Sequence, residues 1–162
     1  KFAQTYRNLN KISTLNISRV YIRDLFENMH RLMQPTLDQK NIDMEVVLKD
    51  PDIAIDADAD LIEQVMINII LNAIEAVRES EVRLIVLSAT TTQNKKTLIK
   101  ISDNGTGISD DLLDKIFIPF FSTKKTGSGI GLSLCKQIMM MHKGHLTVQS
   151  VAGEGTAFTM QF

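Results

Sequence analysis

The order in which β-rich and helical segments alternate is the feature that most constrains the fold of this chain. Strand-like segments come mostly in pairs, and a helical segment lies between one pair and the next. Paired strands joined by short turns favour antiparallel contacts, whereas a regular parallel sheet needs a helix after every strand. We therefore predict an α+β fold of two layers, an α/β sandwich in which one mixed, mostly antiparallel sheet is covered by helices.

The expected elements follow from the spacing of apolar residues. From Arg19 onward apolar side chains recur three and four residues apart, which predicts an amphipathic helix that Pro35 should kink or end. Asp58 and Ser109 are residue types that cap helices, and each precedes a helical pattern. The other expected ranges are 59–78, 110–117 and 129–142 for helices, 42–46 and 53–55 for short strands, and 82–90 with 97–102 and 146–151 with 156–162 for hairpins.

The composition is typical of one folded domain, with 162 residues, 44% hydrophobic residues and a net charge of −1. The apolar content excludes a disordered chain, and the single Cys135 excludes a disulfide scaffold. A near-zero charge predicts no nucleic-acid partner, and no apolar run approaches the ~18 residues of a membrane span. The chain opens at Lys1 with no signal peptide, so we expect a piece of a longer protein.

Several familiar site motifs are incomplete. Residues 56–60 resemble the start of a calcium loop, but Leu61 stands where that loop needs glycine. The glycines within 127–131 are spaced GxGxG rather than GxGxxG, and no GxxxxGK[ST] segment exists, which argues against two common nucleotide loops. The three histidines lack metal-ligand spacing and are expected on the surface or at helix ends. Cys135 is expected to be a buried thiol.

Two asparagines on the helix expected at 59–78 suggest a metal or phosphate site. Asn68 and Asn72 are four residues apart, so they share one helical face. A neutral amide oxygen is a hard ligand that can hold Mg²⁺ already bound to phosphates. The alternative, two amides on a solvated face, remains open on this pattern alone.

An aspartate at the end of a predicted strand suggests a site for a planar ligand. Asp103 is followed by Gly105 and Gly107, and glycines let a ligand approach the backbone closely. A buried carboxylate can accept a hydrogen bond from an exocyclic amine such as that of adenine. The alternative is a turn, because Asn-Gly is a strong turn signal.

The segment 126–132 suggests an anion site. Its glycines run into a predicted helix, and backbone N–H groups at a helix start can bind phosphate. Lys124 and Lys125 lie just upstream and can neutralise phosphate charge. The alternative is a flexible linker.

Together and in this order, these segments resemble the ATP-binding catalytic domain of bacterial two-component sensor histidine kinases, in the GHKL superfamily with gyrase, MutL and heat-shock chaperone ATPases. The resemblance covers residues 19–162 and implies a Bergerat-type ATP-binding fold. Residues 1–18 resemble the end of the preceding dimerisation helix and its linker, and the short segment 122–126 is similar to the nitrogen-regulation type of kinase. The matching segments are LIEQVMINIILNAIEAV, DNGTGI, IFIPFFSTK, GSGIGL and GEGTAFTMQF.

The resemblance implies a role for each matching residue. Asn72 would coordinate Mg²⁺, and Asn68 and Lys124 would act at the phosphates during transfer. Asp103 would bind the adenine amine, with Gly105, Gly107 and Ile108 shaping the pocket and Thr156 behind it. The glycine segment, with Gly127, Gly129, Gly131 and Leu132, would form a lid based on Phe117, Phe120 and Phe121.

The implied function is a kinase that holds Mg-ATP and donates its γ-phosphate to a histidine on the dimerisation domain, for relay to an aspartate of a response regulator receiver domain. The chain's own histidines lack the Glu or Asp that follows an acceptor histidine, so the acceptor should lie upstream. Glu75 stands where many members carry Lys. We expect the domain in the cytoplasm with no membrane contact of its own, although the full-length protein could be membrane-anchored. The alternatives are a GHKL-type ATPase, which would need a Glu where Asn68 stands, and a degenerate nucleotide-sensing or docking module.

Overall fold

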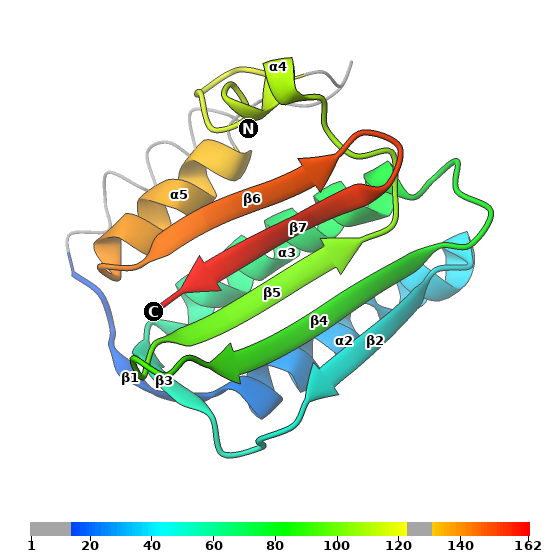
Figure 1. Ribbon diagram of the computed structural model, residues 1–162. Coiled ribbons are helices and arrows are strands. Elements are labelled where there is room, and N and C mark those ends of the chain that lie inside the picture. Colours follow the sequence, from blue (N-terminus) through cyan, green and yellow to red (C-terminus); the bar gives the residue numbers. More distant parts are fainter. Residues whose placement is uncertain (1–13, 123–130) are drawn as a thin grey trace.

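A five-stranded mixed sheet forms one layer of the computed structural model, which describes residues 14–122 and 131–162 (Figure 1). The strand order is β2-β4-β5-β7-β6. β2 and β4 pair in parallel, and the other neighbours pair antiparallel. The mixed, mostly antiparallel sheet predicted from the sequence is therefore confirmed. The strands are β2 (Asp43–Leu48), β4 (Leu84–Thr91), β5 (Thr97–Asp103), β6 (His145–Val151) and β7 (Gly155–Gln161).

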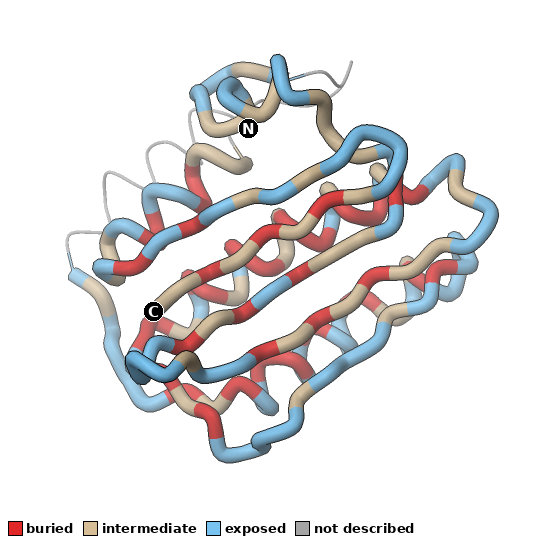
Figure 2. Tube along the Cα trace, in the orientation of Figure 1, coloured by how far each residue is buried: buried red, intermediate tan, exposed pale blue. Residues whose placement is uncertain are grey.

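Helices form the second layer and cover one face of this sheet (Figure 1). α3 contacts both α2 and α5, and all three contribute to a single apolar core with the inner sides of the strands. The buried positions follow the helices and strands as regular stripes on the trace (Figure 2). The long helices are α2 (Ile22–Lys40), α3 (Ala59–Ala76) and α5 (Gly131–Met141), and α4 (Asp110–Leu113) is a single short helix.

α3 begins where the sequence predicts. The Asp58 side chain accepts a hydrogen bond from the Leu61 N–H, with 3.3 Å between oxygen and nitrogen, so the predicted helix cap is confirmed. The apolar stripe of the helix is buried, with Ile62, Val65 and Ile70 fully covered. α3 ends at Ala76, two residues before the predicted end at Arg78.

The start of α2 differs from the prediction. Residues Ser18–Tyr21 form β1, which pairs antiparallel with β3 (Ala54–Ala57) in a separate two-stranded sheet. Val20 pairs with Ile55 across this sheet, and such long-range pairing leaves no trace in local apolar spacing. The predicted helix start at Arg19 is therefore wrong, and α2 begins at Ile22.

Pro35 does not end α2, because the helix continues to Lys40 and is capped at Asn41. A proline inside a helix deprives the carbonyl four residues earlier of its N–H partner. That carbonyl belongs to Arg31, which is exposed, so water can bind it instead. Burial of Met33 and Leu37 on either side of Pro35 stabilises the continued helix.

The helix expected at 110–117 is shorter in the structure than predicted. α4 ends at Leu113, and the chain continues through turns closed by hydrogen bonds from Lys115 to Leu112 and from Ile118 to Lys115, at 2.9 and 3.0 Å. The Ser109 side chain makes no capping hydrogen bond at its start.

The segment before β1 is bound to the helix layer. The Asn16 backbone N–H donates to the Asp58 carboxylate over 3.1 Å, and Leu15 packs against the core. The Asp58 backbone N–H donates in turn to His142 Nε2 over 3.1 Å, just beyond the end of α5. His142 therefore lies at a helix end, as predicted.

Candidate nucleotide site

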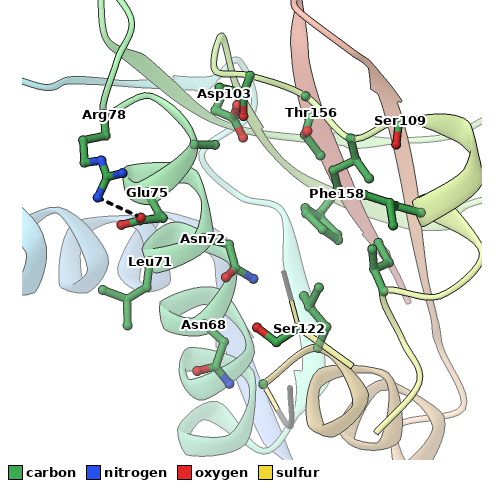
Figure 3. A pocket seen from close by; sticks show the side chains of 18 of the residues that line it. Asn68, Leu71, Asn72, Glu75, Arg78, Asp103, Ser109, Ser122, Thr156 and Phe158 are labelled. Carbon is green, nitrogen blue, oxygen red and sulfur yellow. Dashed lines mark ion pairs between the residues drawn. The ribbon is translucent and has the colours of Figure 1, made fainter. Parts of the chain in front are cut away.

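A cavity of about 700 Å³ opens beside α3, between that helix, the loop after β5 and the start of α5 (Figure 3). Among the predicted site residues, those that line it are Asn68, Asn72, Asp103, Gly107, Ile108, Gly131, Leu132 and Thr156. These come from four segments distant in the sequence, so the fold gathers them at one place. Lys124, Gly127 and Gly129 lie outside the described residues, and Gly105 does not line the cavity.

α3 supplies one wall. Asn68 and Asn72 lie one turn apart and both line the cavity, as the helical spacing predicts (Figure 3). Gly131, the first residue of α5, lies opposite them. A Cβ added there would stand 4.0 Å from Asn68 Cγ, which is ordinary contact. The start of α5 and the asparagine face of α3 therefore border the same space.

Asn68 also contacts α5 through Cys135. Its Nδ2 donates to Cys135 Sγ over 3.7 Å, and the thiol donates to the Val65 carbonyl over 3.8 Å. Cys135 is fully buried, and this burial raises the pKa of its thiol to about 12, although the hydrogen bond from Asn68 lowers it. The predicted buried thiol is confirmed, and it ties the asparagine to the neighbouring helix.

Asp103 lies at the end of β5, opposite Thr156 on β7. Burial raises the pKa of the Asp103 carboxyl above its ordinary value, while backbone hydrogen bonds from Gly105 and Thr156 act in the opposite direction. The bond from the Gly105 N–H spans 2.8 Å. The carboxylate is thus held in place by the backbone, with its remaining acceptor capacity available to a ligand.

Thr156 is 6% exposed and stands behind Asp103 as expected from the resemblance. Its hydroxyl lies 2.8 Å from that of Ser150 on β6. Ser150 also accepts from the Ile108 N–H over 2.7 Å, so one serine joins the β6–β7 edge to the loop after β5. These bonds fix the position of the cavity wall that carries Asp103.

The two glycines after Asp103 are required for different structural reasons. A Cβ on Gly105 would lie 2.3 Å from the Ala76 carbonyl oxygen, so this glycine lets the loop press against the end of α3. Gly107 has φ +70°, which favours glycine, and a Cβ there would lie 2.2 Å from the Val151 carbonyl oxygen. Only Gly107 borders the cavity directly.

The three phenylalanines predicted to anchor a lid are placed differently. Phe117 packs edge-on against Phe158, with ring centroids 6.5 Å apart, and Phe121 lines the cavity. Phe120 is 65% exposed.

Other residues also line the cavity. Glu75 and Arg78 form an ion pair over 3.3 Å at the rim, where Figure 3 marks it with a dashed line. The family resemblance already marks Glu75 as the position where many members carry Lys, and its place three residues before Arg78 indicates the ion pair. Ser109, Ser122 and Phe158 line the cavity through tertiary contacts that local sequence does not reveal.

The donor set suits a metal that arrives with its ligand. Within residues 14–122 and 131–162, no three His, Cys, Asp or Glu side chains gather into a metal site. Amide oxygens from α3 can add to the coordination of Mg²⁺ held by phosphates without adding negative charge.

No helix within residues 14–122 and 131–162 is both long and apolar enough to cross a membrane.

Comparison with protein families gives a match over residues 57–162 to the family described as histidine kinase-, DNA gyrase B-, and HSP90-like ATPase. The chain is 31% identical over 152 residues to the sensor histidine kinase ZraS of Salmonella typhi, covering 94% of this chain and 32% of that protein. It is 36% identical over 143 residues to the histidine-protein kinase AtoS of Escherichia coli, covering 88% and 23%. The chain thus spans about a third or less of these relatives.

Comparison with solved structures also finds histidine kinases. The catalytic domain of histidine kinase ThkA superposes with a TM-score of 0.81 at 28% identity, covering 91% of this chain and 95% of that one. ThkA in complex with the response regulator protein TrrA gives a TM-score of 0.81 at 25% identity, covering 99% of this chain and 46% of that one.

Proposed function

Because this chain belongs to the histidine kinase-, DNA gyrase B-, and HSP90-like ATPase family, we propose that it is the ATP-binding catalytic domain of a sensor histidine kinase. It holds Mg-ATP and donates the γ-phosphate to a histidine on an upstream dimerisation domain. The phosphoryl group then passes to an aspartate of a response regulator. Residues 19–162 form this domain, residues 1–18 are the end of the dimerisation helix and its linker, and both lie in the cytoplasm.

The observation that carries the proposal is the spread of complementary groups along one cavity. Asp103 and Thr156 lie toward the end of α3, where a buried acceptor suits the adenine amine. Asn72 and Asn68 lie one and two turns back along the helix, where amides suit a metal-bound triphosphate (Figure 3). An adenine nucleotide laid along α3 would therefore meet the right chemistry at each end.

The chain's residues bind and orient rather than react. Asp103 accepts from the adenine amine, and the Asn72 amide oxygen holds the metal. Lys124, Gly127 and Gly129 supply phosphate contacts from the lid. The metal, when bound, neutralises phosphate charge. Phosphoryl transfer depends mainly on such positioning and charge stabilisation, so no covalent intermediate on this chain is required.

The phosphoacceptor lies outside this chain. His142 is committed to the fold, since its ring bonds both the Asp58 N–H and the Ile138 carbonyl. His30 and His145 precede Arg31 and Leu146, not an acidic residue. A separate dimerisation domain must therefore present the attacking histidine.

Hydrolysis of ATP as the main activity fits the site poorly. A water-activating base must take up a proton near neutral pH, and the Asn68 amide cannot. One N–H of the Asn68 amide also donates a hydrogen bond to Cys135. The ATPase and docking-module alternatives are therefore less favoured than the kinase.

Incubation with labelled Mg-ATP and a separately supplied histidine-bearing dimerisation domain tests the proposal. We expect label on the histidine domain and slow release of phosphate when that domain is absent. Rapid ATP turnover with no transfer to any histidine domain would favour the ATPase. Calorimetry with no heat at millimolar Mg-ATP would overturn nucleotide binding itself.

A further inference from the structure

The linker before β1 is hydrogen bonded to Asp58, the N-cap residue of α3, and Asp58 is hydrogen bonded in turn to His142 beyond the end of α5. One Asp58 carboxylate oxygen caps α3 at the Leu61 N–H, and the other accepts from the Asn16 backbone N–H. The Asp58 residue is only 9% exposed, so its bond to Leu61 is buried, while its bond to the exposed Asn16 is partly buried. A single buried carboxylate therefore joins the linker to the first turn of α3.

α5 reaches the same place from the other side. Its first residues, Gly131 and Leu132, line the cavity, and His142 follows its last turn. His142 Nδ1 bonds the Ile138 carbonyl over 2.8 Å, so Nδ1 carries the proton and Nε2 accepts from the Asp58 N–H. The ring also packs edge-on against Phe162, with centroids 6.4 Å apart. α5 thus touches the cavity at one end and Asp58 at the other.

We propose that Asp58 and His142 are positioning residues that clamp the linker to α3 and α5, so that nucleotide binding in the cavity and docking of the linker at Asn16 favour each other. The proposal rests on the proposed function, because it takes Mg-ATP as the ligand of the cavity.

The physical route is short and continuous. A nucleotide that contacts Gly131 and Asn68 fixes α5 against α3 at the cavity. Because α5 is one uninterrupted helix, His142 is fixed against the Asp58 backbone at the far end. A better-held Asp58 keeps its carboxylate aligned with Asn16. By thermodynamic linkage, a docked linker must then raise nucleotide affinity by the same factor.

This arrangement bears on the phosphoryl transfer reaction. The linker carries the chain toward the domain that presents the acceptor histidine. A linker held against the nucleotide helices limits the directions from which that histidine can approach. Positioning of the two reactants is the main source of rate in such a transfer.

Asp58→Asn is the variant that separates the clamp from the helix cap. Asparagine caps helices as well as aspartate does. When its one oxygen accepts from Leu61, its NH₂ group faces the Asn16 N–H and cannot accept. Asn16→Ala is the matched control, because it changes the side chain and keeps the backbone N–H.

His142 is tested by a pair of variants. His142→Ala removes the acceptor for the Asp58 N–H, and His142→Gln offers a side-chain oxygen in its place. His145→Ala is the control, since His145 is an exposed residue at the start of β6.

The measurement is amide hydrogen exchange at Leu15, Asn16 and Ile17, with and without saturating Mg-ATP, beside calorimetric Mg-ATP affinity. In the unmodified chain we expect Asn16 to be protected and Mg-ATP to slow its exchange further. Asp58→Asn should raise Asn16 exchange about ten-fold, the loss of one hydrogen bond to a carboxylate. His142→Ala should abolish the effect of Mg-ATP at Asn16, and His142→Gln should restore part of it.

Three results would overturn the inference. They are fast Asn16 exchange in the unmodified chain, exchange that is the same with and without bound Mg-ATP, and a His142→Ala variant that keeps the nucleotide effect. Failure of Mg-ATP to bind at all would instead overturn the proposed function, while the exchange of Asn16 in Asp58→Asn would still test the clamp. Urea unfolding of each variant shows whether the fold itself has changed.

Discussion

The two ends of the cavity are built in different ways. At the proposed adenine end, Asp103 and Thr156 stand on neighbouring strands, and hydrogen bonds from the backbone hold the carboxylate. At the proposed phosphate end, Asn68 and Asn72 project from one helix toward the start of another. The strand-built end presents a fixed acceptor suited to one base. The helix-built end presents amides whose proposed partners are a metal and flexible phosphates, so the proposed function places base recognition and phosphoryl transfer in separate parts of the fold.

The largest effect should come from the phosphate end. Asn72→Ala removes the proposed amide ligand for Mg²⁺, so transfer to a supplied histidine domain should fall by about 100-fold. Adenosine affinity should stay within about two-fold, because the adenine end is untouched. Asn94→Ala, in the exposed turn between β4 and β5, is the control. Equal losses of transfer and of adenosine binding would show that the two ends do not act separately.

Asp103→Asn should weaken binding of the base itself, which Asn72→Ala should spare. Loss of a charge-assisted hydrogen bond costs about 1.5–3 kcal/mol, so adenosine and ATP should both bind about 10- to 100-fold more weakly. Calorimetry with and without Mg²⁺ should show the same loss in each case. Asp43→Asn, on the exposed edge strand β2, is the control. A loss seen only with Mg²⁺ would assign Asp103 to the metal instead.

The pH dependence of adenosine binding sharpens this assignment. Because burial raises the pKa of Asp103, the carboxylate takes up a proton at a higher pH than an ordinary aspartate does. Adenosine affinity should therefore fall as the pH drops through that raised value, when the acceptor is lost. The Asp103→Asn variant should lack this step, and a step that persists in the variant would belong to another group.

The glycines at the two ends should differ in what they tolerate. Gly105→Ala places a methyl group 2.3 Å from the Ala76 carbonyl oxygen and should cost about 1–3 kcal/mol of unfolding free energy. Gly131→Ala meets its nearest atom at 4.0 Å and should leave stability unchanged or slightly raised. Urea unfolding of both variants measures this, and equal costs would contradict the difference in packing.

The smallest effect is expected at the rim. Glu75→Gln removes a negative charge beside the cavity and releases Arg78, so ATP should bind about two- to three-fold more tightly at low salt. Added salt should reduce this gain, since the pair is solvent-exposed. Adenosine should bind unchanged, and tighter adenosine binding would show that Glu75 acts on the base rather than on the phosphates.

The sequence predicts the helix-built end better than the strand-built end. Asn68 and Asn72 share a face because of the helical repeat alone, and their place in the cavity follows once α3 packs against the sheet. The nearness of Thr156 to Asp103 depends on pairing between β5 and β7, and only the family resemblance pointed to it before the structure.

Other features depend on contacts that no local pattern carries. β1 forms because Val20 pairs with Ile55 on β3, and Gly105 is required because the loop packs against the Ala76 carbonyl. The role of Lys124 stays a prediction, because it lies outside the described residues.

β2 lies at one edge of the sheet as the structure describes it, and this has a consequence for how copies of the domain behave in a crowded solution. An open edge carries unpaired backbone groups that can join a strand from another molecule and begin an aggregate. β2 exposes Val46 and Val47, which are 43% and 42% accessible, and so it carries this hazard. Asp43 and Glu45 on the same strand are exposed too, and two such edges brought together would set acids against acids. These two carboxylates, which do not line the nucleotide cavity, therefore oppose edge-to-edge association of the domain.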